Sequence, residues 1–249
     1  MSRAGAMKEN RYDDAAFFEK YAAMPRSREG LEAAGEWETL RDMLPDMAGR
    51  RVLDLGCGYG WHCRYALERG AASVTGVDIS RRMLDVARSS TPPGAVDYLC
   101  APMEDVDFPE AAFDLVLSSL ALHYVSSFED VARGVYRWLA PGGDFVFSVE
   151  HPIFTARGDQ DWHRAPDGSI LHFPVDHYFA EGAREALFLG ERICKYHRTL
   201  TGYLDCLLAI GFSLRRVVEP TPPARMLDME GMRDELRRPM MLLVAAKRP

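Results

Sequence analysis

Hydrophobic and polar residues follow two distinct rhythms along this chain. From residue 51 onward, short and mostly apolar runs bounded by turn signals indicate buried strands, and the segments between them repeat apolar residues at helical spacing. Strands are expected at 51–55, 73–77, near 96–100, 113–118 and 144–149, and helices at 59–69, 81–89 and 128–139. Such alternation predicts an α/β fold with a parallel sheet and right-handed crossovers.

The rest of the chain is predicted to complete and cover this core. Helix 200–210, capped by Thr199 and ended by Gly211, precedes strands near 213–218 and 240–246. Residues 13–44 have helical periodicity broken at Pro25 and Gly30, which indicates two lid helices. After Pro152 the regular pattern lapses, and turn signals among many aromatic residues indicate a cap built from hairpins.

These segments predict one domain over residues 1–249. Its parts are expected to be a lid at 12–44, a core at 45–151 and 198–249, and a cap inserted at 152–197. A chain of 249 residues suits an α/β domain with an insertion.

Composition narrows the possible partners. No apolar run approaches the roughly 18 residues of a membrane span, and the polar segment 1–14 carries no signal-peptide core. A formal net charge of −7 argues against a nucleic-acid partner, because phosphate binding needs a basic face. The five cysteines form no metal-ligand spacing and are expected to be reduced thiols. We expect a cytoplasmic monomer or homodimer without a metal.

One short motif gives the chemistry. Residues 52–60 read Val-Leu-Asp-Leu-Gly-Cys-Gly-Tyr-Gly, and Asp78 ends the next apolar run. A strand that breaks into a glycine turn before a helix lets a ligand lie against bare backbone. The dinucleotide spacing G-x-G-x-x-G is absent, since Trp61 stands where the third glycine would fall. The turn therefore favours a nucleoside ligand without a pyrophosphate.

The turn and Asp78 together resemble the first two motifs of the class I S-adenosylmethionine-dependent methyltransferases. The resemblance extends over most of the chain and implies a Rossmann-like sheet of seven strands in the order 3-2-1-4-5-7-6, with the last strand antiparallel. S-adenosylmethionine is the implied cofactor and S-adenosylhomocysteine its product. The phrases at 60–65, 147–152 and 196–199 resemble a widespread bacterial and fungal branch without an agreed substrate.

The resemblance implies a role for each residue that matches a family motif. Asp54 would orient the turn or reach the cofactor's amino group, and Asp78 would accept both ribose hydroxyls, because a carboxylate has two oxygens at the spacing of a cis-diol. Glu104 would accept from the adenine amino group, with Asp105 as the alternative if the register slips by one. The other implied cofactor contacts are Gly56, Cys57, Gly58, Ile79, Met83, Met103 and Ser118, with Tyr12, Tyr21 and Arg26 in the lid.

The acceptor is expected to be a small molecule, by exclusion. The fourth strand is followed by Ser-Ser-Leu-Ala-Leu-His-Tyr at 118–124, which matches neither the Pro-Pro-aromatic motif of DNA amino-methylating enzymes nor the Pro-Cys of RNA methylases. A hydroxyl or protonated amine acceptor needs a base. His151 after the fifth strand and His197 where the cap returns to the core are the candidates.

Other functions remain open at this stage. The leading hypothesis is a methyltransferase acting on oxygen, nitrogen or carbon of a small molecule, and a flexible peptide terminus is a possible acceptor. A nicotinamide-dependent oxidoreductase is the first alternative, and a non-catalytic nucleoside-binding regulatory protein is the second.

Overall fold

A single mixed sheet organises the computed structural model, which describes residue 8 and residues 10–249. The expected domain of 1–249 and the polar segment 1–14 thus lie partly outside the described residues. The strands run in the order β3-β2-β1-β4-β5-β11-β10, and β11 lies antiparallel to both its neighbours. This confirms the predicted order 3-2-1-4-5-7-6. The strands are β1 Arg51–Leu55, β2 Ser73–Asp78, β3 Asp97–Cys100, β4 Phe113–Ser119, β5 Leu139–Glu150, β10 Ser213–Val218 and β11 Met241–Lys247.

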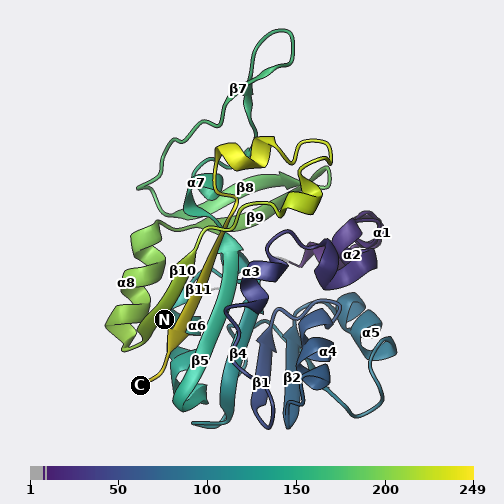
Figure 1. Ribbon diagram of the computed structural model, residues 1–249, viewed down its shortest axis with the longest axis vertical. Coiled ribbons are helices and arrows are strands. Elements are labelled where there is room, and N and C mark those ends of the chain that lie inside the picture. Colours follow the sequence, from purple (N-terminus) through teal and green to yellow (C-terminus); the bar gives the residue numbers. More distant parts are fainter. Residues whose placement is uncertain (1–7, 9) are drawn as a thin grey trace, which may run out of the picture.

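Helices cover both faces of this sheet because its strands are apolar on both sides. On one face Leu53 and Phe147 pack with α6 (Phe128–Trp138) and α8 (Leu200–Ile210). On the other face Val52 and Leu115 pack with α3 (Trp37–Arg41), α4 (Trp61–Glu68) and α5 (Arg81–Ser89). The two layers hold the carboxyl ends of the parallel strands at one edge (Figure 1).

Side-chain caps explain where the core helices begin. Ser80, Ser127 and Thr199 each accept a hydrogen bond from the backbone N–H three residues on, at the starts of α5, α6 and α8. Gly211 ends α8 in a left-handed conformation with φ of 114°. These signals are local in sequence, so the predicted bounds of α5, α6 and α8 agree with the structure to within one residue.

The lid contains more and shorter helices than expected. Instead of two helices it forms η1 Arg11–Asp13, α1 Ala15–Ala22, α2 Pro25–Glu29, η2 Gly30–Ala33 and the core-packed α3. Gly30 interrupts the run, with φ of 71° and its Cα against the Trp61 ring. A Cβ there would lie 2.6 Å from Trp61 Cε3, so the chain turns where only glycine fits.

The cap consists of a short helix and two hairpins, as its turn signals indicated. It contains α7 Pro152–Thr155, the hairpin β6–β7 (His163–Arg164 with Ile170–His172) and the hairpin β8–β9 (Gly182–Phe188 with Glu191–His197). The β6–β7 hairpin projects away from the sheet (Figure 1). The β8–β9 hairpin packs on the lid, where Phe17 joins Ala186 and Ile193.

Residues 219–240 were expected within the core at 198–249, with no element predicted before the strand near 240. They form a second cover that we call the roof segment. It includes only the short turns η4 (Ala224–Met226) and η5 (Asp234–Arg237). Arg225 fixes one part to the lid through Glu38 Oε1 at 3.1 Å and the Glu32 carbonyl at 2.7 Å. Near its other end, the Arg238 guanidinium lies within 5.0 Å of the ring centres of Phe154, Trp162 and Phe173 in the cap.

Candidate functional site

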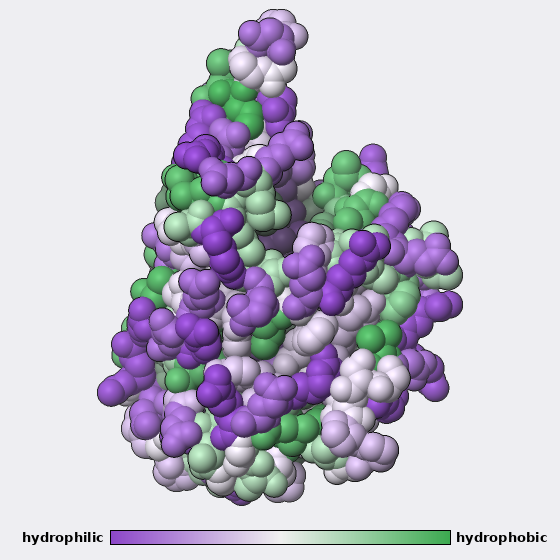
Figure 2. Space-filling view, turned by 45° about the vertical axis from the view of Figure 1, so that its right-hand side comes forward, coloured by the Kyte–Doolittle hydropathy of each residue, from purple (hydrophilic) through white to green (hydrophobic). Residues whose placement is uncertain are grey.

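A cavity of about 500 Å³ lies where the carboxyl ends of the central strands meet their covers. Its walls come from the turn after β1, the ends of β2, β4 and β5, the lid, strand β9 and the roof segment. Figure 2 shows the surface hollowed between the cap and the lid. Open α/β sheets bind ligands at this edge, so this cavity is the candidate site.

The turn after β1 consists of glycines because the backbone there is left-handed. Gly56, Gly58 and Gly60 have φ of 76°, 52° and 70°. A Cβ at Gly56 would lie 2.3 Å from the Cβ of Ala121, whereas a Cβ at Gly58 would meet nothing within 4 Å. Gly56 therefore permits a close approach, and Gly58 leaves open space. Both line the cavity together with Cys57.

Asp78 ends β2 beside this turn and lines the same cavity. Its Oδ2 accepts from the Gly58 N–H and its Oδ1 from the Ser80 N–H, each at 2.8 Å. Burial raises the pKa of Asp78 to about 6 in spite of these hydrogen bonds. Each oxygen keeps a second lone pair, which suits acceptance from the two hydroxyls of a ribose.

Asp54 lies behind the turn rather than in the cavity lining. Its side chain is buried, Oδ2 accepts from the Cys63 thiol at 3.4 Å, and Oδ1 has no hydrogen-bond partner in the described part of the chain. Burial raises the pKa of Asp54 to about 7, and the charge of Asp78 adds to the shift. This position suits orientation of the turn, not contact with a ligand's amino group.

The residues expected around an adenine also line the cavity. They are Ile79, Met83, Met103 and Glu104. Asp105, the alternative to Glu104, instead forms an ion pair with Lys8. The structure thus brings Glu104 to the cavity and turns the neighbouring carboxylate outward.

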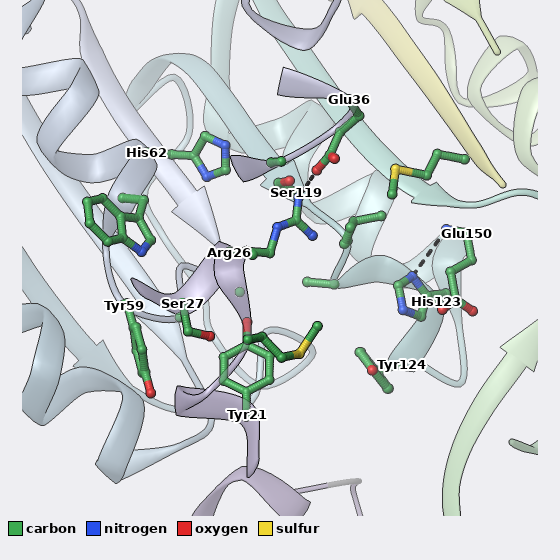
Figure 3. A pocket seen from close by; sticks show the side chains of 18 of the residues that line it. Tyr21, Arg26, Ser27, Glu36, Tyr59, His62, Ser119, His123, Tyr124 and Glu150 are labelled. Atoms are coloured by element: carbon green, nitrogen blue, oxygen red, sulfur yellow. Dashed lines mark hydrogen bonds and ion pairs between the residues drawn. The ribbon is translucent and has the colours of Figure 1, made fainter. Parts of the chain in front are cut away.

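The lid places all three of its expected residues at the cavity. Tyr12, Tyr21 and Arg26 line it, and Arg26 forms an ion pair with Glu36 (Figure 3). Glu36 is buried, and its Oε2 has no hydrogen-bond partner among the residues described. Arg26 keeps further N–H donors that suit a carboxylate.

The start of the lid is fastened to the core beside Asp78. Asp13 Oδ1 accepts from the Ser80 hydroxyl at 2.7 Å and from the Arg82 N–H at 3.1 Å. The Tyr12 hydroxyl lies 3.2 Å from that of Tyr124, which follows β4. The lid therefore covers the glycine turn and Asp78.

Ser118 does not reach the cavity, in contrast to the expectation. It is fully buried and donates to the Leu55 carbonyl at 2.7 Å, which ties the end of β4 to β1. Ser119 lines the cavity instead. The difference follows from strand geometry, because neighbouring residues point to opposite faces.

Neither His151 nor His197 lines the cavity, so the structure does not bring the two expected bases to it. His151 is buried, its Nδ1 accepts from the Ile153 N–H at 3.0 Å as the cap of α7, and its Nε2 lies 2.7 Å from Glu219 Oε1. His197 is fully buried, and its Nδ1 and Nε2 lie 2.8 Å from Thr155 Oγ1 and the Tyr178 carbonyl. Both histidines hold the cap in place.

Three polar residues that the sequence analysis did not propose line the cavity instead: His123 after β4, Glu150 at the end of β5 and Lys195 on β9. The Glu150 N–H lies 3.4 Å from His123 Nδ1, as Figure 3 shows. Lys195 Nζ donates to Glu150 Oε1 at 2.5 Å and to Gln160 Oε1 at 3.0 Å. For His123 and Glu150, the positions after β4 and at the end of β5 were the available signal.

Methionines form the second feature that was missed. Eight line the cavity, and four of them belong to the roof segment. The eight are Met24, Met83, Met103, Met226, Met229, Met232, Met240 and Met241, the last of these at the start of β11. The repeated Met at 226, 229 and 232 was the available signal in the sequence. Flexible thioether side chains provide an adaptable apolar surface.

Residue 8 and residues 10–249 offer neither of two other kinds of site. They contain no group of three or more His, Cys, Asp or Glu side chains able to hold a metal ion. They also contain no helix long and apolar enough to cross a membrane.

Comparison with known proteins identifies the class that this fold and site define. A family model described as a methyltransferase domain matches residues 53–147. A candidate S-adenosylmethionine-dependent methyltransferase from Listeria monocytogenes is 51% identical, with a TM-score of 0.84 over 88% of this chain and 99% of that one. An S-adenosylmethionine-dependent methyltransferase from Mesorhizobium loti is 43% identical, with a TM-score of 0.82 over 88% of this chain and 100% of that one.

A more distant relative matches only part of the chain. A malonyl-[acyl-carrier protein] O-methyltransferase from Enterobacter lignolyticus is 39% identical over 112 residues, which are 45% of this chain and 43% of that enzyme. The similarity therefore covers less than half of either protein.

The fold and the glycine turn define a nucleoside-binding α/β protein. Because the two solved relatives match nearly their whole length, the chain belongs to the class I S-adenosylmethionine-dependent methyltransferases, and its cofactor is S-adenosylmethionine. This membership decides against the nicotinamide oxidoreductase that was the first alternative.

Proposed function

We propose that this methyltransferase acts on a small-molecule acceptor enclosed between the lid, the cap and the roof segment. The observation that supports this most directly is the cavity itself. It is bounded by Asp78 and the glycine turn on one side and by His123, Glu150 and Lys195 on another. Covers on several sides leave less room for a folded macromolecule than for a small molecule.

Each part of the cavity lining has a role in this proposal. S-adenosylmethionine supplies a methyl group already activated on a positively charged sulfur. Gly56 and Gly58 expose backbone to it, Asp78 accepts from the ribose, and Arg26 binds the carboxylate. Ile79, Met83, Met103 and Glu104 surround the adenine. The lid and roof segment exclude water and align the acceptor, which is the main requirement of an in-line displacement.

An oxygen acceptor is the version of this function that the relatives favour. The partial relative named above is an O-methyltransferase. His123 after β4 and Lys195 on β9 offer hydrogen-bond donors, which suit an oxygen nucleophile better than a protonated amine.

The test of the cofactor assignment is calorimetric binding of S-adenosylhomocysteine to the full chain and to Asp78→Asn. Loss of two charge-assisted hydrogen bonds to the ribose should weaken binding by about 30-fold or more. Asp105→Asn is the matched control, since this nearby acid faces Lys8, and its affinity should change less than threefold.

Two results would contradict the proposal. Equal affinities of wild type and Asp78→Asn would show that the acid is not at the ribose. Tight cofactor binding without methyl transfer to any acceptor in a metabolite extract would favour the non-catalytic regulatory alternative.

A further inference from the structure

The cavity has one half that the proposed cofactor contacts do not use, and we call it the acceptor half. It lies around the ends of β4 and β5, strand β9 and the roof segment. Met241 of β11 is paired with Glu150 in the sheet, so β11 brings Met240 and Met241 next to the polar cluster. Met226, Met229 and Met232 continue the apolar surface from the roof segment.

Polar groups gather at one place in this apolar half. Glu150 and Lys195 are almost wholly buried, with 14% and 4% of their side chains exposed, and their ion pair is supported by Gln160. His123 is 2% exposed. Two of the three protons on Lys195 Nζ are donated to Glu150 and Gln160, which leaves one for a ligand in the cavity.

The hydrogen bond to His123 decides which of its nitrogens carries a proton. Burial lowers the pKa of His123 to about 4, so the ring is neutral at pH 7. Its Nδ1 faces the Glu150 N–H and must accept, so the proton lies on Nε2. Nε2 has no hydrogen-bond partner within the described part of the chain. His123 therefore presents a donor to the cavity.

None of the acceptor-half groups is a free base. Burial acts to raise the pKa of Glu150, but its interactions with His123, Lys195 and Gln160 lower it by more, and each oxygen accepts a hydrogen bond. Glu235 pairs with Arg238 at 2.7 Å. In the described residues of this half, Lys195 and His123 are donors, and Glu150, whose pKa is lowered, is a weak base.

We propose that the acceptor is an aliphatic carboxylic acid, bound as its carboxylate by Lys195 Nζ and His123 Nε2, with its chain among the roof methionines, and that the product is its methyl ester. The inference rests on the proposed function. Alcohols and phenols need a base to become nucleophiles and ammonium groups need one to expose a lone pair, whereas a carboxylate is ionised at neutral pH.

The step balances without a further reactant. A carboxylate oxygen forms a bond to the methyl carbon as the carbon–sulfur bond breaks, and the electron pair of that bond remains on sulfur. The negative charge of the carboxylate and the positive charge of the sulfonium cancel, and no proton is released. Lys195 and His123 orient the oxygen, and the apolar methionine surface excludes water.

The first test measures binding to the full chain saturated with S-adenosylhomocysteine. The probes are octanoate, 1-octanol and octylamine, titrated by calorimetry at pH 7.5. Octanoate should bind at least about tenfold tighter than the other two, because only it makes charge-assisted hydrogen bonds to Lys195. Equal affinity of octanol or octylamine would overturn the proposal.

Variants separate the charged contact from packing. Lys195→Gln should weaken octanoate by about tenfold and leave octanol unchanged, while Lys195→Arg should stay within about threefold. If Lys195→Gln does not fold, His123→Phe tests the second donor and should also weaken octanoate selectively. Equal weakening of all three probes by these variants would refute the carboxylate contact.

The apolar part of the proposal has its own pair of variants. Met229→Gln should weaken octanoate several-fold, and Leu208→Gln, a change at a side chain of the same exposure on α8, should not; Met229 and Leu208 are 51% and 52% exposed. Equal effects of the two would remove the roof segment from the acceptor site.

Turnover supplies a final readout. With S-adenosylmethionine and octanoate, mass spectrometry should detect methyl octanoate, and a pH indicator should show no proton release. If S-adenosylhomocysteine binds with the expected dependence on Asp78 but octanoate is not preferred, only the acceptor inference fails. If S-adenosylhomocysteine does not bind, the proposed function fails first.

Discussion

Two buried carboxyl groups determine the electrostatics beside the glycine turn. The pKa of Asp54 is raised to about 7 and that of Asp78 to about 6, in both cases mainly by burial. Both groups thus titrate near neutral pH rather than near their ordinary value of 3.8. Asp78 has two backbone donors, but Asp54 has only the Cys63 thiol, so ionisation of Asp54 is the less compensated of the two.

Asp54→Asn should therefore change how stability depends on pH. In the wild type, the pKa of Asp54 is near 3.8 in the unfolded chain and about 7 in the folded protein. Its ionisation therefore lowers the free energy of unfolding as pH rises through this window, and has no further effect above it. Asn does not ionise, so the variant does not lose this part of its free energy of unfolding. Relative to wild type, the variant should gain about 2–3 kcal/mol between pH 5 and pH 8, measured by urea denaturation.

The comparison uses only the difference between the two pH values, because the Asn amide makes its own contacts through Oδ1 and Nδ2, and these do not change with pH. Asp78 titrates in both proteins, but its charge helps to raise the pKa of Asp54, so the difference reports the ionisation of Asp54 together with this interaction. Parallel stability curves for the two proteins from pH 5 to pH 8 would show that Asp54 is not the group responsible.

Individual site residues were predictable where a single strand and its following turn determine them. Gly56, Gly58 and Asp78 lie at strand ends, and the direction of a strand determines where they point. His151 and His197 failed because their direction depends on how the cap folds back, which no local pattern reports. His123 was missed because it lies on a 3-10 turn, η3 (Leu122–Tyr124), which directs it to the cavity and which the sequence did not predict.

At the scale of single elements, the contact between η2 and α4 explains why Gly30 breaks the lid. Trp61 begins α4, and its ring occupies the space that a Cβ on Gly30 would need. Trp61 thereby takes a structural role at the position where a dinucleotide site would have its third glycine.

Gly30→Ala should destabilise the protein more than Gly94→Ala. The two glycines have φ of 71° and 75°, but a Cβ at Gly94 meets nothing within 4 Å. The control should cost about 1 kcal/mol for backbone strain alone, and Gly30→Ala about 2–4 kcal/mol, because the clash with Trp61 is added. Urea unfolding gives both values, and equal costs would show that the Trp61 ring yields without penalty.

A helix or strand was predictable when the residues that determine it lie close together in the sequence. The core helices carry caps and one apolar stripe, so their bounds followed from the sequence. The roof segment contains only short 3-10 turns, and its anchors reach far along the chain: Arg225 to Glu38, and Arg238 to Phe154 and Phe173. Only the folded chain shows such contacts.

For the molecule as a whole, the order of the sheet followed from the alternation of strands and helices together with the resemblance to a known family. The arrangement of the covers did not. The sequence indicated a lid and a cap, but in the structure the β6–β7 hairpin projects away while β9 and the roof segment line the cavity.

Hydrogen exchange should distinguish the covers that line the cavity from the β6–β7 hairpin. On addition of S-adenosylhomocysteine, amides of the lid at 12–37 should exchange more slowly, because the ligand holds the lid against the glycine turn. Those of β6 and β7 should not change. Mass spectrometry of peptides resolves these segments, and equal protection of the lid with and without ligand would refute its gating role.

The ties of Arg225 between the roof segment and the lid link the two ligand sites thermodynamically. A cofactor that orders the lid also orders residues 32 and 38, to which Arg225 is attached. The roof segment is then partly ordered before the acceptor binds, so the acceptor loses less entropy when it orders the roof methionines. Such heterotropic coupling is reciprocal: the factor by which the cofactor tightens the acceptor equals the factor by which the acceptor tightens the cofactor. The ternary complex is therefore favoured over either binary one, and each ligand leaves more slowly while the other is bound.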